Sequence, residues 1–274
     1  GITQPQVWTA AASPHVVPSG FTIRAAVTLE PCAVVRLGPD VTLIVNAGGS
    51  IVANGLADRP VVIERQDPAR PWSRIQALGG GTLRLTHTRL LGGGAPLNAP
   101  LDAAAAIDVR GADQTQPPGE QLHVDNVLIE GSASQGVLLR EAGGFSLAST
   151  GLVIRGSAHA PIDAWASAAG TIPSGTYTGN ARDEITLEGT GLGAIVRDAT
   201  LRDRGVAYRV GDSLTDGRLD VAARPPLTLA TLTIEPNVTL RFKRGGALFV
   251  QFAQNTSPAT GALVAQGTPQ APIR

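Results

Sequence analysis

A stretch near the N-terminus of the 274-residue chain returns near the C-terminus, and this internal repeat limits the possible folds more than any other feature. The first copy runs from Val27 to Ile63 and the second from Leu232 to Ile273. Thr-Leu-Glu-Pro in the first copy lies over Thr-Ile-Glu-Pro in the second, and Arg36 lies over Arg241. The second copy is longer because of a polar insertion within Phe252 to Thr260, which predicts a surface loop. A repeat of this kind indicates a structural module.

Short β-rich runs fill the chain from Phe21 onward. Runs such as AVVRL, VTLIV and PVVI are each stopped by Gly, Pro, Asp or Asn, and none is long enough for an ordinary helix. The 33 glycines and 20 prolines predict many turns between them. Apolar and polar residues alternate in Thr82 to Thr88, as in a strand with one buried face. With 43% hydrophobic residues, the sequence predicts an ordered all-β protein.

The spacing of two similar runs favours one all-β architecture. Asn126 to Gly131 and Thr150 to Gly156 lie about 25 residues apart, which is the length of one coil of a parallel β-helix. Two-residue Asn-Gly or Asp-Gly loops, which would join such strands as hairpins, are scarce. We therefore predict a parallel β-helix, with a β-sandwich or jelly roll as the alternative. Its interior stack is expected to include Val124, Val127, Ile129, Val137, Leu139, Val153 and Ile154.

Several of these runs resemble a known family. NVLIEG, LVIRG and the pair GGSIVANGLADRPVVIE and GALVAQGTPQAPI are similar to the right-handed parallel β-helix repeat proteins of bacterial surfaces. The resemblance implies a right-handed solenoid and an extracellular or cell-surface location. It carries no catalytic residue, since such scaffolds serve adhesins and surface-layer-like proteins as well as lyases, glycosidases and epimerases.

The repeat also suggests how the chain is divided. Residues 1–20, with Trp8 and three prolines, are expected to form a lead-in segment or cap, and residues 21–226 the parallel β-helix. Residues 227–274 are expected to start a second, repeated β-helix module. The first copy is followed by further coils, so we expect the second module to continue past Arg274 in a longer repetitive surface protein.

One segment, Ser157 to Glu184, lacks the regular coil spacing and is interpreted as a long interrupting loop. In a chain with 4% aromatic residues, Trp165 and Tyr177 are its candidates for stacking on a sugar ring. The alternative for Trp165 is that it seals the side of the solenoid. The carbohydrate-binding candidates of this segment are His159, Asp163, Trp165, Tyr177, Arg182 and Asp183.

The sequence offers little for catalysis. The nearest acid–base candidates are His123 with Asp125 and Asp108 with Arg110, and each pair is interpreted as polar residues on the solvated face of a strand. Among the motifs of pectin-type glycosidases, only Arg-x-Lys has a match, at Arg241 to Lys243, which we attribute to chance. No catalytic residue is assigned.

Charge and composition limit the partners. The 22 basic and 22 acidic residues balance, which argues against nucleic acid, and no apolar run approaches a membrane span. The four histidines lack metal-ligand spacing, and the single Cys32 excludes an internal disulfide, so we expect neither a metal nor another cofactor. The sequence favours a non-catalytic extracellular scaffold, adhesive or carbohydrate-binding module, with polysaccharide or another surface protein as its partner. The alternative is a polysaccharide lyase or glycoside hydrolase.

Overall fold

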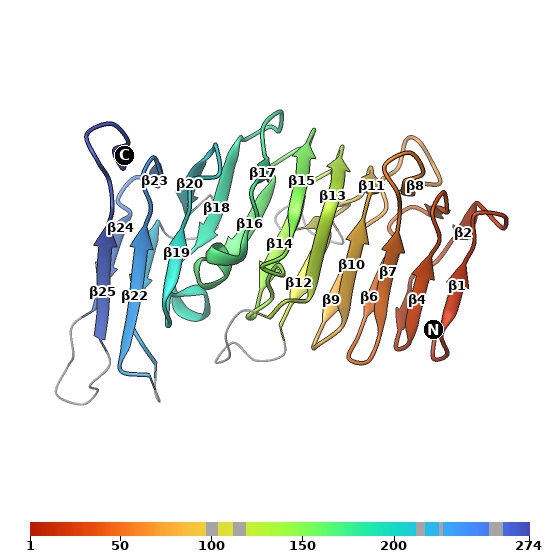
Figure 1. Ribbon diagram of the computed structural model, residues 1–274, viewed down its shortest axis with the longest axis horizontal. Coiled ribbons are helices and arrows are strands. Elements are labelled where there is room, and N and C mark those ends of the chain that lie inside the picture. The colour runs from red at the N-terminus through yellow and green to blue at the C-terminus, as the bar shows by residue number, and fades with distance from the viewer. Residues whose placement is uncertain (97–103, 112–118, 212–216, 225–226, 252–259) are drawn as a thin grey trace.

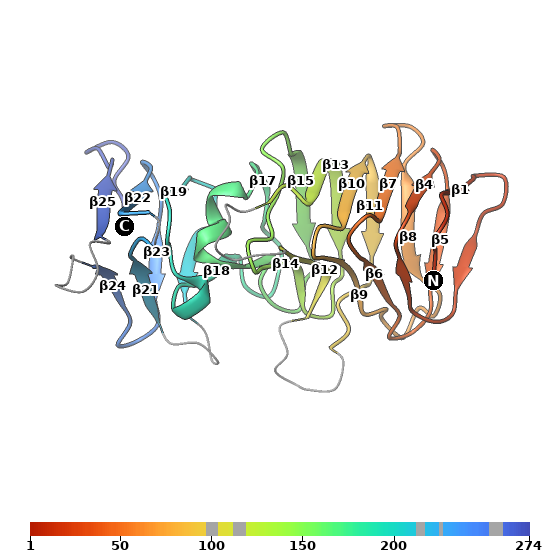
Figure 2. The same ribbon diagram turned by 90° about the horizontal axis from the view of Figure 1, so that it is seen from below.

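The computed structural model describes residues 1–96, 104–111, 119–211, 217–224, 227–251 and 260–274. Parallel strands lie side by side along one long axis, with the N-terminus at one end and the C-terminus at the other (Figure 1; Figure 2). Each strand pairs with a strand of the preceding or following coil. The fold is therefore an all-β parallel solenoid, as the coil spacing predicted, and the sandwich alternative is wrong. The insertion predicted within Phe252 to Thr260 lies outside the described residues, apart from Thr260.

The chain passes three faces in every coil, and we name them in chain order. The first face holds β1 (Gln6–Trp8), β4 (Ala26–Leu29), β7 (Ser50–Asn54), β10 (Thr82–Thr86) and the first half of β13 (Leu122–Glu130). The second face holds β2 (His15–Val17), β5 (Val34–Leu37), β8 (Val61–Arg65), β11 (Thr88–Leu91), the second half of β13, β15 (Thr150–Arg155) and β17 (Gly175–Thr176). The third face holds β3 (Phe21–Ile23), β6 (Thr42–Val45), β9 (Arg74–Leu78), β12 (Ala105–Arg110), β14 (Gln135–Arg140), β16 (Ile162–Trp165), β18 (Glu184–Glu188), β20 (Ala207–Val210) and β23 (Leu240–Phe242).

Two shorter parallel sheets are formed by the strands nearest the C-terminus. They are β21 (Arg218–Val221) with β24 (Ala247–Val250), and β19 (Ala199–Leu201) with β22 (Leu229–Ile234) and β25 (Thr260–Ala265). Two short 3-10 helices, η1 (Ala166–Thr171) and η2 (Gly191–Gly193), follow β16 and β18. Both helices lie where the chain leaves the third face.

A bend joins the first two faces into one sheet at β13. Asn126 has a φ of 54°, and the strand before it pairs with β10 while the strand after it pairs with β11. His87, between β10 and β11, also has a positive φ. Asn is among the residues that tolerate this left-handed conformation, so it can turn the strand without breaking it.

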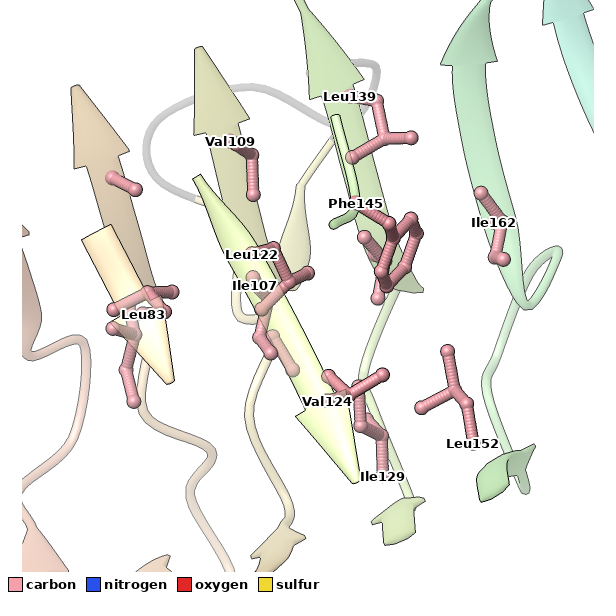
Figure 3. Packing of buried hydrophobic residues seen from close by; sticks show 14 of the residues in the cluster. Leu83, Ile107, Val109, Leu122, Val124, Ile129, Leu139, Phe145, Leu152 and Ile162 are labelled. Carbon is pink, nitrogen blue, oxygen red and sulfur yellow. The ribbon is translucent and has the colours of Figure 1, made fainter. Parts of the chain in front are cut away.

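The core is a continuous stack of apolar side chains inside the coils. Along the third face, Ile75, Ile107, Val137 and Ile162 are in direct register and all are buried. Figure 3 shows side chains from several strands, Ile107, Leu139, Phe145 and Leu152 among them, gathered between the faces. The predicted interior residues are buried with one exception: Leu152 points inward in place of Val153, which is half-buried.

The segment predicted to interrupt the solenoid is one of its coils, so that prediction is wrong. Val137 of β14 pairs with Ile162 of β16, and Ile162 pairs with Ile185 of β18. Between β16 and β18, Gly175 of β17 pairs with Leu152 on the second face. The segment looked irregular because η1 and polar turns replace the apolar run of a longer strand there.

The sequence repeat is also a structural repeat, down to single hydrogen bonds. Cys32 N donates to Arg59 O at 3.3 Å, and the matching Asn237 N donates to Ala271 O at 3.3 Å. Thr28 pairs with Val52 across β4 and β7, as Thr233 pairs with Val264 across β22 and β25.

The two copies nevertheless occupy different faces of the same stack. β5, which carries Arg36, lies on the second face, whereas its counterpart β23, which carries Arg241, pairs with β20 on the third face. The second copy is thus rotated by one face about the solenoid axis.

Strand pairing also runs across both predicted domain boundaries. In residues 1–20, β1 pairs with β4 and β2 pairs with β5, so this part supplies strands of the first coil. In residues 227–274, β22 pairs with β19 and β23 pairs with β20. The repeated segment is therefore stacked directly on the coils that precede it.

Candidate functional site

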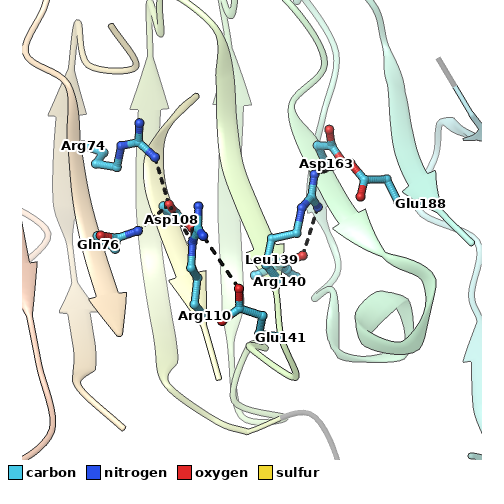
Figure 4. A network of polar contacts seen from close by, with 9 residues as sticks. All are labelled: Arg74, Gln76, Asp108, Arg110, Leu139, Arg140, Glu141, Asp163 and Glu188. Atoms are coloured by element: carbon cyan, nitrogen blue, oxygen red, sulfur yellow. Dashed lines mark hydrogen bonds and ion pairs between the residues drawn. The ribbon is translucent and has the colours of Figure 1, made fainter. Parts of the chain in front are cut away.

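Polar side chains gather on the outer side of the third face. Because Ile107 and Val109 point into the core, Asp108 and Arg110 between and beside them point outward. Strand register places Asp108 beside Gln76 and Leu138, and Leu138 beside Asp163. We call the resulting group the third-face cluster; it consists of Arg74, Gln76, Asp108, Arg110, Arg140, Glu141, Asp163 and Glu188 (Figure 4).

Asp108 is the centre of one half of the cluster. Its side chain is 0% exposed, and Oδ2 accepts hydrogen bonds from Arg74 Nη1 at 3.1 Å and Gln76 Nε2 at 2.8 Å. Arg110 Nε contacts Oδ1 at 3.2 Å. A carboxylate removed from water is costly unless it is paired, and here two guanidinium groups and an amide supply the partners.

Arg110 in turn is influenced by its acidic neighbours. Burial by itself would lower the pKa of Arg110, but the negative charges of Asp108 and Glu141 and the hydrogen bond to Asp108 outweigh burial, so the pKa is raised. Arg110 Nη1 lies 3.7 Å from Glu141 Oε1. Arg110 therefore stays cationic and links the buried Asp108 to the more exposed Glu141.

Arg140 is the centre of the other half. Its Nη2 donates to Asp163 Oδ1 at 3.1 Å and to Glu188 Oε1 at 2.6 Å, and its Nη1 donates to the backbone oxygen of Leu139. These groups come from three neighbouring strands, β14, β16 and β18. Asp163 is buried, whereas Glu188 is about one quarter exposed, so this ion pair reaches from the protein interior to solvent.

A surface depression of about 420 Å³ lies over the cluster. Its walls are formed by Arg74, Arg110, Leu138, Arg140, Glu141, Trp165 and Glu188. Trp165 is 9% exposed, so only part of its ring borders the depression. The depression offers guanidinium donors, carboxylate acceptors and part of one aromatic side chain, on strands of one sheet.

The structure separates the six carbohydrate-binding candidates. Both Asp163 and Trp165 are on β16, but only Trp165 borders the third-face depression, whereas Asp163 is buried and paired with Arg140. Arg182 and Asp183 are exposed and border a second depression of about 450 Å³ together with Glu184, Arg209 and Arg241. His159 is exposed in the turn before β16, where its backbone oxygen accepts a hydrogen bond from Arg182 N.

Tyr177 is the candidate that the structure removes from any sugar-stacking surface. Its side chain is 1% exposed within the core, and its hydroxyl donates to Pro173 O at 2.7 Å. Burial raises the pKa of Tyr177, which outweighs the lowering effect of Arg204. The expectation that Tyr177 faces a ligand is wrong because β17 turns this ring inward.

The acid–base candidates behave differently from one another. Asp108 with Arg110 was interpreted as a solvated pair, but Asp108 is buried, so that interpretation is wrong for the carboxylate. His123 and Asp125 are half-buried on the first face, and Asp125 Oδ1 accepts from Asn126 Nδ2 at 2.8 Å. In the described part of the chain, no group of three or more His, Cys, Asp or Glu side chains is arranged to hold a metal ion. No helix among the described residues is long and apolar enough to cross a membrane.

Comparison with known proteins gives no relative from which a function could be carried over. No protein-family model, no curated protein and no solved structure matches the chain.

Proposed function

We propose that this chain is a non-catalytic scaffold or adhesive module of a bacterial surface or secreted protein of the parallel β-helix repeat type, and that it binds a polysaccharide at the third-face depression. The sequence resemblance supports the surface location. The long, rigid stack of coils supports the scaffold role, since a solenoid offers an extended surface for a chain-like partner.

One observation carries the choice of site: Trp165 borders the same depression as Arg110, Arg140, Glu141 and Glu188. Sugar hydroxyl groups both donate and accept hydrogen bonds, so they suit a wall on which guanidinium and carboxylate groups alternate. The accessible part of the Trp165 side chain adds apolar contact with the carbohydrate C–H groups. Because Arg110, Arg140, Trp165 and Glu188 are on strands β12, β14, β16 and β18, little ordering of the protein is needed on binding.

The ion pairing favours binding over catalysis. Glycoside hydrolysis uses one carboxyl group as an acid and a second as a base or nucleophile. Asp108 is held by Arg74 and Arg110, and Asp163 by Arg140. Both carboxyl groups are also buried, so neither is placed to reach the glycosidic bond of a bound sugar.

The proposal is tested by screening the chain on a glycan array and measuring the affinity of any ligand by calorimetry. Glu141→Gln and Glu188→Gln keep the side-chain shape but remove a charge from the depression, and we expect each to weaken binding about tenfold, or about 1.4 kcal/mol. Glu130→Gln is the matched control, because Glu130 forms an exposed pair with Arg155 on the second face. Equal affinity in all four proteins would exclude this site, and an array without any ligand would contradict carbohydrate binding.

A carbohydrate-active enzyme is the second candidate. It is favoured by four carboxylates, those of Asp108, Glu141, Asp163 and Glu188, on neighbouring coils beside three arginines. Incubation with acidic and neutral polysaccharides, followed by assays for unsaturated uronides and new reducing ends, separates the two functions. Product formed by the unmodified chain and lost in Glu141→Gln or Glu188→Gln would replace the binding proposal with the enzymatic one.

A further inference from the structure

A separate depression of about 390 Å³ lies where the end of η1 meets the segment that follows β19. Its polar lining consists of four hydroxyl side chains and two arginines, which are Ser146, Ser149, Thr171, Ser174, Arg202 and Arg204. No acidic residue is among the described residues that line it. This composition differs from that of the third-face depression, where carboxylates and guanidinium groups alternate.

Both arginines are oriented by backbone carbonyl groups. Arg204 Nε donates to Ile172 O at 2.9 Å, and Arg202 Nη1 donates to Gly170 O at 2.7 Å. A carbonyl oxygen fixes the direction of a guanidinium group but leaves its full positive charge in place. Arg202 and Arg204 are two positions apart and lie on the same depression, so their charges add.

One of the two guanidinium groups, that of Arg202, is paired with a carboxylate, and the other, that of Arg204, is not paired with any described residue. Glu235 Oε1 is 3.4 Å from Arg202 Nε, whereas Arg204 has no ion pair with any described residue and uses its Nη1 on Asp203 O. Asp203 Oδ1 accepts from the backbone N of Gly205 in its own turn. Glu120 accepts a hydrogen bond from Ser146 Oγ and is not part of the lining.

Two buried tyrosines donate hydrogen bonds to the backbone of residues that line the depression. Tyr208 donates its hydroxyl hydrogen to Arg202 O at 2.8 Å, and Tyr177 donates to Pro173 O. Burial raises the pKa of Tyr208 to about 12, although Arg204 acts to lower it. Both rings are therefore neutral hydrogen-bond donors at ordinary pH and add no negative charge to the site.

We propose that this depression is a binding site for an oxyanion, the sulfate or carboxylate group of a larger ligand. Guanidinium groups bind such groups through charge-assisted hydrogen bonds, and Arg204 uses only two of its five N–H groups in the contacts described above. The hydroxyl of Ser174, which is exposed, supplies a further donor at the rim. The site is independent of the third-face depression and of the proposed polysaccharide binding there.

The inference is tested with inorganic sulfate, by calorimetry and by thermal unfolding at constant ionic strength in sodium sulfate against sodium chloride. The unmodified chain is expected to bind sulfate saturably, and Arg204→Gln to weaken that binding at least tenfold. Arg155→Gln, which removes an exposed arginine from the second face, is expected to bind sulfate as the unmodified chain does. Oligosaccharides that carry uronate or sulfate groups then show which oxyanion is preferred.

A second variant covers the case in which Arg204→Gln unfolds. Ser174→Asp keeps both arginines and places a negative charge at the exposed rim, where it repels sulfate and competes for the guanidinium groups, so it should abolish sulfate binding without lowering the melting temperature. Equal sulfate binding by the unmodified chain, Arg204→Gln and Ser174→Asp would overturn the inference, as would a response to sulfate no larger than the response to chloride. Absence of glycan binding at the third face would leave the inference intact.

Discussion

Neighbouring residues of one strand have opposite roles in this solenoid, because alternate side chains point into the core and out to solvent. Ile129 of β13 is buried and stacks beside Ile154 of β15. Val153, one position earlier on β15, is outward and half-buried. We expect Ile129→Ala to lower the free energy of unfolding by about 2–5 kcal/mol, since it leaves a cavity between coils.

Val153→Ala is the matched control for that prediction. It removes an apolar group of similar size from the outer side of the same sheet, and we expect a loss of about 1 kcal/mol or less. Denaturant unfolding monitored by circular dichroism measures both. Equal losses in the two variants would contradict the assignment of inward and outward residues.

At the residue scale the sequence predicted most of the core residues, but it did not show everywhere which residues of a strand point inward. Leu122 and Val124 alternate with His123 and Asp125, so their common inward direction was evident. Leu152, Val153 and Ile154 are all apolar, so the sequence does not show which of them point into the core. Gly151 just before them has a φ of 63°, which interrupts the inward and outward alternation of the strand. Tyr177 could not be placed from sequence, because its inward direction depends on the two-residue strand β17.

At the element scale, the two copies of the repeat have different residues at the same position of one turn. The turn between β4 and β5 has Pro31 followed by Cys32 with a φ of 68°, and Ala33 N donates to Glu30 O at 2.9 Å. This is the arrangement of a type II turn, in which the third position favours Gly or Asn. The second copy has Asn237 there, with a φ of 65°. Cys32 is thus the more strained choice.

We therefore expect Cys32→Asn to raise the free energy of unfolding by about 0.5–1 kcal/mol, because Asn tolerates the left-handed region better than Cys. Cys32 is exposed, so the substitution fills no core position. Cys32→Ala separates the backbone effect from the loss of the thiol, and it should give no gain. If Cys32→Ala and Cys32→Asn stabilise equally in denaturant unfolding, the turn argument fails.

The third-face cluster is an arrangement that the sequence pattern could only partly predict. Asp108 and Arg110 were recognisable as outward residues of one strand, but their partners Arg74 and Glu141 come from other coils. Coil lengths differ along the chain, so the sequence did not show which residues of neighbouring coils are paired. The equivalence of Cys32 and Asn237, in contrast, follows from the sequence, because each comes directly after the Glu-Pro pair of its copy. The structure agrees, since the backbone N–H groups of both residues donate to matching carbonyl oxygens.

At the scale of the whole molecule, each coil contacts only the coils beside it, so local stability should follow position along the axis. A central coil has neighbours on both sides, and Val137 and Leu139 of β14 are fully buried. On β25, Leu263 pairs with the buried Leu232 yet is 42% exposed, because among the described residues β25 has a neighbour on one side only.

We therefore expect backbone amides of β12 and β14 to exchange hydrogen most slowly, and those of β24 and β25 to exchange fastest. The difference in opening free energy should reach a few kcal/mol, since local opening need not unfold the whole stack. The amides of the first coil should exchange at an intermediate rate, because two contacts hold this end of the stack. The rings of Trp8 and His15 stack with their centres 5.2 Å apart, and Ile2 N donates to Thr22 O. Hydrogen exchange followed by mass spectrometry measures this order. Uniform protection from β4 to β25 would show instead that the rotated repeat and the preceding coils open only as one cooperative unit.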